Sequence, residues 1–272
     1  MTVGTHRIAV SDDRSVSAPV DYEPISAEGS TVVVVGGTSG IGRAISLAFA
    51  TEGANVVPTS RSEERVAEAA EAVRDRGGEA LAVTCDVTDR ESLDALADAA
   101  VDRFGDVDVL VNSPGAIARA GVPDVTDDEW DRVLDVQLTG VHRTVQTFVD
   151  RTGVESVVNV ASLSSLLGIE DLAAYSAAKG GIDGYTHAAA KDLGPDVRVN
   201  AVRPGFVATP QTADAYAEGS HRYERIVERA PIGRIGRPAD IAGAVVYLSS
   251  SAASYVTGET VTVDGGFTPS AF

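Results

Sequence analysis

The chain has 272 residues and no run of eighteen apolar residues, which suits one large α/β domain and predicts no membrane-spanning helix. Its 40 acidic and 22 basic residues give a formal charge of -18, so neither nucleic acid nor an anionic membrane is an expected partner. Such a surface repels itself at ordinary salt, whereas at molar salt the Debye length shrinks to roughly 3 Å. We therefore expect a halophilic source. An ordinary acidic protein from an arginine-favouring genome is the alternative.

The first 29 residues show no sustained periodicity and lack the apolar centre of a signal peptide. We expect residues 1–29 to form a loosely attached arm, residues 30–272 to form a single domain, and the protein to be cytoplasmic. The single cysteine, Cys85, excludes an intrachain disulfide. The four histidines are scattered along the chain, so no metal site is predicted.

From Ser30 onward, short β-branched apolar runs alternate with segments that carry apolar residues at three- and four-residue spacing. The predicted strands are Thr31–Val35, Asn55–Thr59, Ala80–Thr84, Val107–Val111, Ser156–Ala161, Val197–Val202 and Thr260–Val263. The predicted helices are Ile41–Glu52, Glu63–Arg76, Glu91–Arg103, Asp127–Arg151, Ala174–Leu193 and Ala239–Ser249, and Ser62 and Thr126 are predicted caps. The alternation predicts a Rossmann-type doubly wound parallel sheet of about seven strands, with helices on both faces.

The first strand runs into a glycine-rich loop, Gly36-Gly37-Thr38-Ser39-Gly40-Ile41-Gly42. Glycines allow a tight turn and a close backbone approach, and the N-terminus of the following helix offers free N–H groups to a pyrophosphate. Because a strand precedes the loop and a helix follows it, we expect these residues to bind a nucleotide.

The end of the second strand favours NADP over NAD. An acidic side chain there would hold a ribose 2′-hydroxyl and repel a 2′-phosphate. The stretch reads Thr59-Ser60-Arg61-Ser62, in which Arg61 can pair with a phosphate and Ser60 leaves room for it. NADP is therefore the predicted cofactor. NAD remains the alternative, in which Arg61 is an ordinary solvated arginine.

Two later strand ends are further candidates for the cofactor site. Asp86 follows the third predicted strand, where its carboxylate either accepts from an adenine amino group or serves as a turn or cap residue. Asn112 to Gly115 end the fourth predicted strand, and a bend there would open the crevice in which such sheets bind ligands.

The candidate catalytic residues are Ser162, Tyr175 and Lys179. Tyr175 and Lys179 share one face of a predicted helix, and Ser162 ends the strand that precedes it. A phenol can supply the proton for carbonyl reduction, but its free pKa of about 10 is high for exchange near neutrality. A nearby ammonium lowers that pKa, and Lys179 is one of only two lysines in the chain. The Ser162 hydroxyl can hold the substrate oxygen.

These motifs together resemble the short-chain dehydrogenase/reductase family over about residues 30–267. The matching stretches are Gly36–Gly42, Asp86 with Val87, Asn112–Gly115, Ser162, Tyr175–Lys179, Asn200–Thr209 and Val263–Gly266. The resemblance implies that Ser162, Tyr175 and Lys179 are catalytic, that Lys179 bonds the nicotinamide ribose, and that the loop containing Pro204, Gly205, Val207 and Thr209 lines the nicotinamide. It also implies a homo-tetramer with the carboxyl-terminal strand at an interface.

The chain departs from the family pattern at three places. Val35 replaces a threonine before the first loop glycine, and Ser113 and Pro114 replace the usual residues after Asn112. Gln137 stands where the family has a helical asparagine that completes the proton relay through a water. Gln137 is either a fourth member of the catalytic set or a helix residue with no part in the chemistry.

The segment from Pro210 to about Gly233 looks like a mobile helical lid that selects the substrate. It is polar, and Tyr216, His221, Arg222 and Tyr223 can form hydrogen bonds. We therefore expect a small-molecule substrate such as a sugar, sugar acid or polyol, interconverted between a secondary alcohol and a ketone or between a lactol and a lactone. A 3-oxoacyl-thioester reductase is the alternative, although the entrance shows little basic excess for a carrier or coenzyme A beyond Arg119, Arg222 and Arg225. A non-catalytic dinucleotide-binding protein is the remaining possibility.

Overall fold

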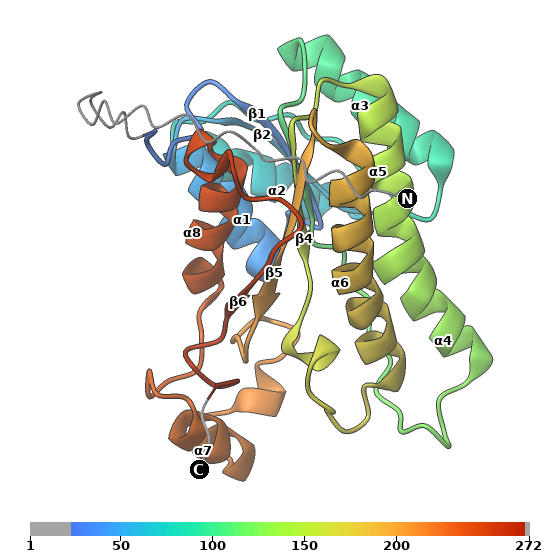
Figure 1. Ribbon diagram of the computed structural model, residues 1–272, viewed down its shortest axis with the longest axis vertical. Helices are drawn as coiled ribbons and strands as arrows, with labels where there is room; N and C mark the ends of the chain where they lie inside the picture. Colours follow the sequence, from blue (N-terminus) through green and yellow to red (C-terminus); the bar gives the residue numbers. More distant parts are fainter. Residues whose placement is uncertain (1–22, 270–272) are drawn as a thin grey trace, which may run out of the picture.

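Six parallel strands form a single sheet in the computed structural model, which describes residues 23–269 (Figure 1). The strands are β1 (Thr31–Val35), β2 (Asn55–Thr59), β3 (Val109–Asn112), β4 (Ser156–Val160), β5 (Arg198–Pro204) and β6 (Thr260–Val263). Their order across the sheet is β2-β1-β3-β4-β5-β6. The chain moves outward from β1 to β2 and then returns to place β3 on the other side of β1. The strand order therefore reverses between β1 and β3, where open α/β sheets bind their ligands.

Helices cover both faces of this sheet (Figure 1). They are α1 (Gly40–Thr51), α2 (Glu63–Arg74), α3 (Arg90–Phe104), α4 (Asp127–Leu134), α5 (Gly140–Arg151), α6 (Ala173–Leu193), α7 (His221–Arg229) and α8 (Pro238–Ser249). One core cluster joins the sheet to α1, α2 and α8, and a second joins it to α3, α5 and α6. The predicted Rossmann-type α/β architecture is confirmed.

The strands are buried because helices cover them from both sides. Val32, Val33 and Val34 in β1 are fully buried, and their side chains alternate between the two core clusters. Phe49 and Phe148 are the largest buried side chains, and they pack on opposite faces. Burial of each such side chain stabilises the fold by about 1.5–3 kcal/mol before the entropy cost of ordering is subtracted. A continuous β-branched run therefore marks a central strand here.

The prediction of about seven strands is wrong by one, because Ala80–Thr84 does not form a strand. This segment lies beside β2, but it is paired there only through an isolated bridge between Ala80 and Val56. Farther along, the Cys85 N–H donates to the Ser60 carbonyl at 3.0 Å. Between Val56 and Ser60 the residue that faces the segment is Pro58, which has no N–H to donate. The missing donor interrupts the ladder, so β2 forms the edge of the sheet.

The predicted helix Asp127–Arg151 is divided in the structure. Its first part is α4 and its last part is α5, and a π-helical turn at Asp135–Thr139 joins them. The predicted cap Thr126 forms a full capping box with Glu129 at the start of α4. Ser62 also acts as predicted and accepts from the Arg65 N–H at 3.4 Å.

Most of the predicted arm, residues 1–22, lies outside the described residues. The part that is described approaches the domain closely, since Ala27 belongs to the core cluster under α1 and α8, and the Gly29 N–H bonds the Gly53 carbonyl at 3.2 Å. Across residues 23–269, every helix is too short or too polar to span a bilayer.

Candidate active site

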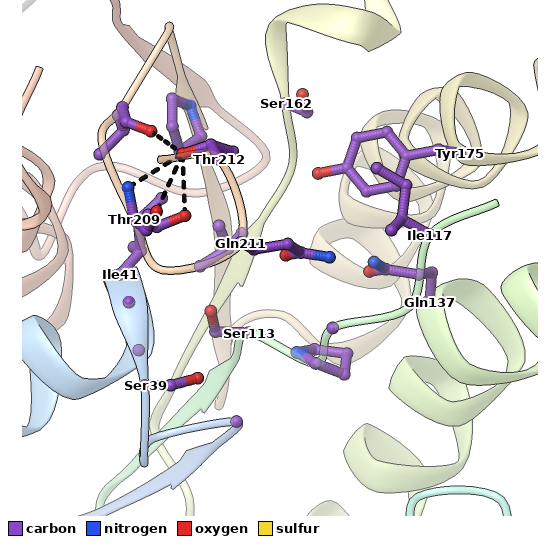
Figure 2. Close-up of a pocket in the computed structure, with 18 of the residues that line it drawn as sticks. Ser39, Ile41, Ser113, Ile117, Gln137, Ser162, Tyr175, Thr209, Gln211 and Thr212 are labelled. Carbon is purple, nitrogen blue, oxygen red and sulfur yellow. Dashed lines mark hydrogen bonds between the residues drawn. The ribbon is translucent and has the colours of Figure 1, made fainter. Parts of the chain in front are cut away.

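A cavity of about 580 Å³ lies at the carboxyl ends of β1 to β5, where the strand order reverses. Loops that follow five different strands meet there, and the segment between β5 and α8 forms its outer wall. Figure 2 shows Ser162 and Tyr175 on one side of this space and Ser39 with Ile41 on the other. The cavity is therefore long enough to join the glycine loop to the candidate catalytic residues.

Almost all site residues predicted from the sequence line this cavity. They are Gly36, Thr38, Ser39, Gly40, Ile41, Gly42, Ser60, Arg61, Asp86, Val87, Gly115, Gln137, Ser162, Tyr175, Lys179, Pro204, Gly205, Val207 and Thr209. The exception is Asn112, which is 1% exposed and stands outside the lining. Its Nδ2 donates to Asn159 Oδ1 at 3.0 Å, so it ties β3 to β4 behind the cavity wall.

The glycine loop is packed too tightly for side chains at two positions. A Cβ on Gly36 would lie 2.1 Å from the Ser113 carbonyl oxygen, and one on Gly42 would lie 2.1 Å from the Gly36 carbonyl oxygen. Gly36 also has a φ of +75°, which favours glycine. Ser39 precedes α1 without a side-chain capping bond, which leaves the N–H groups of the first turn available to an anion. This backbone suits the pyrophosphate of a dinucleotide.

Two arginines lie at the far end of the glycine loop. Arg61 was predicted there, and Arg65, one turn into the neighbouring helix, lines the same cavity. Sequence reasoning missed Arg65, although its spacing of four residues from Arg61 was a usable signal. No acidic residue stands at the end of β2, where the chain reads Thr59-Ser60-Arg61. These groups suit a phosphate better than a ribose hydroxyl.

Asp86 lies beside this pair, and its carboxylate is hydrogen-bonded within its own turn. Its Oδ1 accepts from the Thr88 N–H at 3.0 Å and from the Thr88 hydroxyl at 2.8 Å. Burial raises the pKa of the Asp86 carboxyl, but the Thr88 bonds and the nearby Arg61 guanidinium outweigh this effect and hold the pKa below its ordinary value. The turn role considered for Asp86 is thus present in the structure, and its role toward adenine stays a prediction.

Ser162, Tyr175 and Lys179 converge at the other end of the cavity. Ser162 begins the short turn after β4, and its oxygen accepts from the Ser164 N–H at 3.2 Å. Tyr175 and Lys179 project from the first turns of α6, and the Tyr175 hydroxyl points into the cavity in Figure 2. Lys179 Nζ donates to the Val160 carbonyl at 2.6 Å and lies 5.7 Å from the centre of the Tyr175 ring. A strand end and the following helix thus place the three groups together.

Burial controls the protonation of these groups. It raises the pKa of the Tyr175 hydroxyl above its ordinary value, and a hydrogen bond with Ser162 opposes this increase. It lowers the pKa of the Lys179 amine to about 7. The lower Tyr175 pKa that the sequence argument expects is therefore wrong for this structure, because burial disfavours the charged phenolate more than the Ser162 hydrogen bond favours it.

Gln137 lies in the π-helical turn and lines the cavity with only 2% of its surface exposed. Its Nε2 donates to the Ala116 carbonyl at 2.8 Å, while its Oε1 has no partner among the described residues. Figure 2 shows the Gln137 amide pointing toward the amide of Gln211, a cavity residue that the sequence analysis did not single out. Single-turn π-helices occur often at functional sites.

The predicted lid contains the short turn Asp214–Tyr216 and helix α7. Of its four candidate residues, Tyr216 and Arg222 line the cavity, whereas His221 and Tyr223 do not. Arg119, from the loop after β3, also reaches the lining. The lid side of the cavity therefore carries an aromatic hydroxyl and two guanidinium groups.

Comparison with known proteins identifies the family. A family model described as enoyl-(acyl carrier protein) reductase matches residues 35–268. The 3beta-hydroxysteroid dehydrogenase 1 of Eggerthella lenta is 40% identical over 249 residues, which cover 89% of this chain and 94% of the relative. The chain belongs to the short-chain dehydrogenase/reductase family. The resemblance inferred from the motifs is confirmed.

Two other members of the short-chain dehydrogenase/reductase family are similarly close. The trans-4-hydroxycyclohexanecarboxylate dehydrogenase of Sinomonas cyclohexanicum is 36% identical over 245 residues, covering 87% of this chain and 92% of the relative. A structure from Beutenbergia cavernae, named as an NAD(P)-dependent gluconate 5-dehydrogenase with NADP bound at low occupancy, is 40% identical with a TM-score of 0.84. The match covers 91% of this chain and 100% of that one.

This short-chain dehydrogenase/reductase is therefore an oxidoreductase that acts on CH–OH groups, and its cofactor is a nicotinamide dinucleotide. The prediction of an enzyme is confirmed, so the possibility of a non-catalytic binding protein is set aside.

Proposed function

We propose that this short-chain dehydrogenase/reductase is an NADP(H)-dependent enzyme that interconverts a secondary alcohol and a ketone on a small hydroxylated substrate. The main support is the convergence of Ser162, Tyr175 and Lys179 at one end of a cavity whose other end is a glycine loop. A cavity that joins a dinucleotide cradle to a proton donor suits hydride transfer coupled to proton transfer.

In this proposal each catalytic side chain has a separate task. The bound nicotinamide supplies or accepts the hydride. In the reducing direction the Tyr175 hydroxyl gives its proton to the substrate oxygen, and in the oxidising direction it takes the proton back. Ser162 holds that oxygen through its hydroxyl. Lys179 is held by the Val160 carbonyl beside the Tyr175 ring, where its amine would bond the nicotinamide ribose of a bound cofactor.

We assign Gln137 a positioning role beside this trio. Its bond to the Ala116 carbonyl fixes the loop after β3 against the π-helical turn. Its unpartnered Oε1 is left to accept a hydrogen bond from the cavity. Buried polar atoms without partners are rare, so an acceptor aimed into a site suits a water or a substrate hydroxyl. The longer arm of glutamine thus keeps the amide of the family asparagine in the wall of the site.

The choice of NADP rests on Arg61 and Arg65. Both line the adenosine end of the cavity, and no carboxylate stands at the end of β2 to bind a ribose 2′-hydroxyl. A guanidinium pairs with a phosphate through charge-assisted hydrogen bonds, which are roughly twice as strong as neutral ones. The NADP in the Beutenbergia cavernae structure is consistent with this assignment.

A sugar, sugar acid or polyol is the substrate class that we favour. The polar groups on the lid side of the cavity support it, as do two of the relatives, which are named for hydroxy acids. A 3-oxoacyl-thioester reductase is the second candidate, because the family model is described as an acyl carrier protein reductase and a relative from Thermotoga maritima is named FabG.

We also propose that the enzyme is a cytoplasmic homo-tetramer adapted to concentrated salt. The formal charge of -18 supports the salt adaptation, and the free edge that β6 presents supports an interface on that side. Size-exclusion chromatography with light scattering in low and molar salt tests the assembly. A monomer at both salt concentrations contradicts it.

Tyr175→Phe tests the catalytic assignment directly. The variant keeps the ring in the cavity wall but removes the proton, so turnover is expected to fall by about 10²- to 10⁴-fold while the dissociation constant of NADPH stays unchanged. Tyr185→Phe is the matched control, because Tyr185 lies on the same helix but outside the cavity lining. Retained turnover in Tyr175→Phe contradicts the mechanism.

A further inference from the structure

The lining of the cavity has the opposite charge balance to the chain as a whole. The chain carries 40 acidic and 22 basic residues, but the cavity is lined by five basic side chains and one acidic side chain. Arg61, Arg65 and Asp86 lie at the adenosine end, and Lys179 lies beside Tyr175. The proposed cofactor therefore accounts for these four, while Arg119 and Arg222 have no role toward it.

Arg119 and Arg222 reach the cavity from separate elements, and Arg222 lies against Tyr216. Arg119 lies in the loop after β3, and Arg222 is the second residue of α7. The guanidinium carbon of Arg222 lies 5.6 Å from the centre of the Tyr216 ring. Burial raises the pKa of the Tyr216 hydroxyl, while the positive charges of Arg222 and Arg119 both act to lower it. Arg222 thus lies against this phenol, and Arg119 lines the same cavity.

Tyr216 connects this pair with the catalytic end of the cavity. It lines the same cavity as Tyr175 and contributes to the raised pKa of the Tyr175 hydroxyl. Phe206 supports Tyr216 through an edge-on ring contact, with centroids 5.7 Å apart. A small molecule whose reacting oxygen meets Tyr175 and Ser162 would therefore extend past Tyr216 toward the two arginines.

Neither arginine forms a salt bridge with a carboxylate of residues 23–269. Seven other arginines in that range do form such pairs: Arg74, Arg103, Arg143, Arg151, Arg203, Arg234 and Arg237. Other arginines in that range also lack a salt bridge, but apart from Arg61 and Arg65 at the adenosine end, Arg119 and Arg222 are the only ones among them that line the cavity. Their charge remains available to a ligand.

We propose that Arg119 and Arg222 form a subsite for an anionic group at the end of the substrate remote from the reacting carbon. The substrate is then a hydroxy acid, and its carboxylate binds this pair while its secondary alcohol meets Tyr175. The inference rests on the proposed function and narrows its substrate class. Arginine suits this task because its planar fork matches the two oxygens of a carboxylate. The local positive charge also attracts an anion to a protein that otherwise repels it.

The experiment compares gluconate with sorbitol in the full-length enzyme with NADP, at one fixed ionic strength. The two compounds are six-carbon polyols that differ by a carboxylate in place of a hydroxymethyl group. Wild-type kcat/KM is expected to be at least tenfold higher for gluconate. Arg119→Gln and Arg222→Gln are each expected to raise KM for gluconate about tenfold, with kcat and the KM for NADP unchanged, because a remote contact is the same in the ground and transition states.

Arg225→Gln is the matched control, since Arg225 is an exposed arginine on α7 that does not line the cavity. It is expected to leave the KM for gluconate unchanged. The subsite is overturned if sorbitol is used as well as gluconate, or if the two variants affect both compounds equally. Either result leaves the proposed oxidoreductase function intact.

Calorimetric titration of the enzyme loaded with NADP decides the case in which neither compound is turned over. Gluconate binding that is tighter than sorbitol binding, and that weakens in both variants, supports the subsite. Equal binding or no binding overturns it.

Acetoacetyl-coenzyme A and the neutral N-acetylcysteamine thioester of acetoacetate distinguish a phosphate from a carboxylate as the anion. If the variants impair only the coenzyme A ester, the hydroxy-acid assignment is overturned. The proposed function itself fails only if no alcohol, ketone or thioester reacts.

Discussion

At the scale of single residues, positively charged side chains act differently at the two ends of the cavity, because they are exposed at one end and buried at the other. Arg61 and Arg65 are exposed, so solvent screens them and each contributes mainly when it bonds a phosphate. Lys179 is 3% exposed, and the loss of hydration dominates its behaviour. The same positive charge therefore selects a ligand at one end of the cavity and tunes proton chemistry at the other.

Arg61→Gln tests the cofactor assignment. Loss of the guanidinium removes a charge-assisted bond, so KM for NADP is expected to rise about tenfold while KM for NAD stays unchanged. Initial rates measured with each cofactor give the ratio of KM for NADP to KM for NAD. Arg74→Gln, on the same side of the sheet but outside the cavity lining, serves as the control. An equal change in KM for NADP and in KM for NAD would mean that Arg61 does not recognise the 2′-phosphate.

The buried amine of Lys179 predicts a pH-dependent stability. Its pKa is about 7 in the folded chain, compared with 10.5 for an ordinary lysine. Between these values the unfolded chain binds a proton that the folded chain lacks, so the free energy of unfolding rises as pH is raised from 7 toward 10. Urea unfolding should therefore show wild type gaining stability relative to Lys179→Met over this range.

The exposed Lys191, at the end of the same helix, provides the control for that measurement. Lys191→Met is expected to leave the difference from wild type independent of pH. A Lys179→Met difference that is equally flat would show that the amine is not desolvated in the folded chain.

At the scale of elements, the cofactor end depends on close contacts between loops. The turn after β1 passes within van der Waals limits of the turn after β3, and Gly36 and Gly42 leave no room for a side chain there. The α1 N-terminus keeps its position against the sheet only while both positions are glycine. Backbone packing therefore presents the free N–H groups of α1 to the cavity.

Gly42→Ala tests this dependence on backbone contact. The new Cβ would meet a backbone oxygen at 2.1 Å, so the free energy of unfolding is expected to fall by about 1–3 kcal/mol. Displacement of the α1 N-terminus should also weaken NADPH binding by more than tenfold. Gly184→Ala is the control, because a Cβ in that exposed part of α6 meets open space and should stabilise the helix by about 0.5–1 kcal/mol. Similar behaviour of both variants would contradict the packing argument.

Local sequence patterns were sufficient for most elements because the buried strands are β-branched runs and the helices carry apolar residues at regular spacing; α2 and α4 also begin at predicted caps. They failed at Ala80–Thr84, where a single proline in β2, Pro58, removes the donor that a further strand requires. They also missed the π-helical turn Asp135–Thr139, because the helical periodicity continues almost unchanged across it. In both cases the pattern of backbone hydrogen bonds decides the outcome, and periodicity does not encode that pattern.

The candidate site was predictable only where spacing reveals convergence. Tyr175 and Lys179 are one helical turn apart, so the sequence already placed them on one face. Gln211 joins the site only through the folding of distant loops around one cavity. Asn112 shows the reverse case, since its side chain bonds Asn159 in the next strand and does not face the ligand space.

At the scale of the whole molecule, negative charge is spread over the surface while the cavity lining is mostly positive. An anionic cofactor is repelled by most of the surface but attracted at the site. Added salt weakens both effects, because at molar concentration charges more than roughly 3 Å apart are screened. Salt should therefore stabilise the fold while it weakens the electrostatic attraction of the cavity for an anionic cofactor.

The melting temperature of the cofactor-free protein is expected to rise by roughly 4 °C between 0.1 and 1 M KCl, which is about 1 kcal/mol for a domain of this size. The cause is the loss of repulsion among surface carboxylates as the Debye length falls from about 10 Å to about 3 Å. A quadruple variant separates this cause from general salt effects. It combines Glu52→Gln, Glu68→Gln, Asp102→Asn and Glu228→Gln, which remove four exposed carboxylates that form no salt bridge within residues 23–269.

The variant should melt at a higher temperature than wild type in 0.1 M KCl and gain less from added salt, so that the two melting curves approach each other at 1 M. The two curves converge because screening and removal of charge relieve the same repulsion. If both proteins gain the same number of degrees, salt acts through hydration and not through charge. A melting temperature that falls with salt would mean that attractive ion pairs, such as Arg151 with Asp94 and Asp98, outweigh the repulsion.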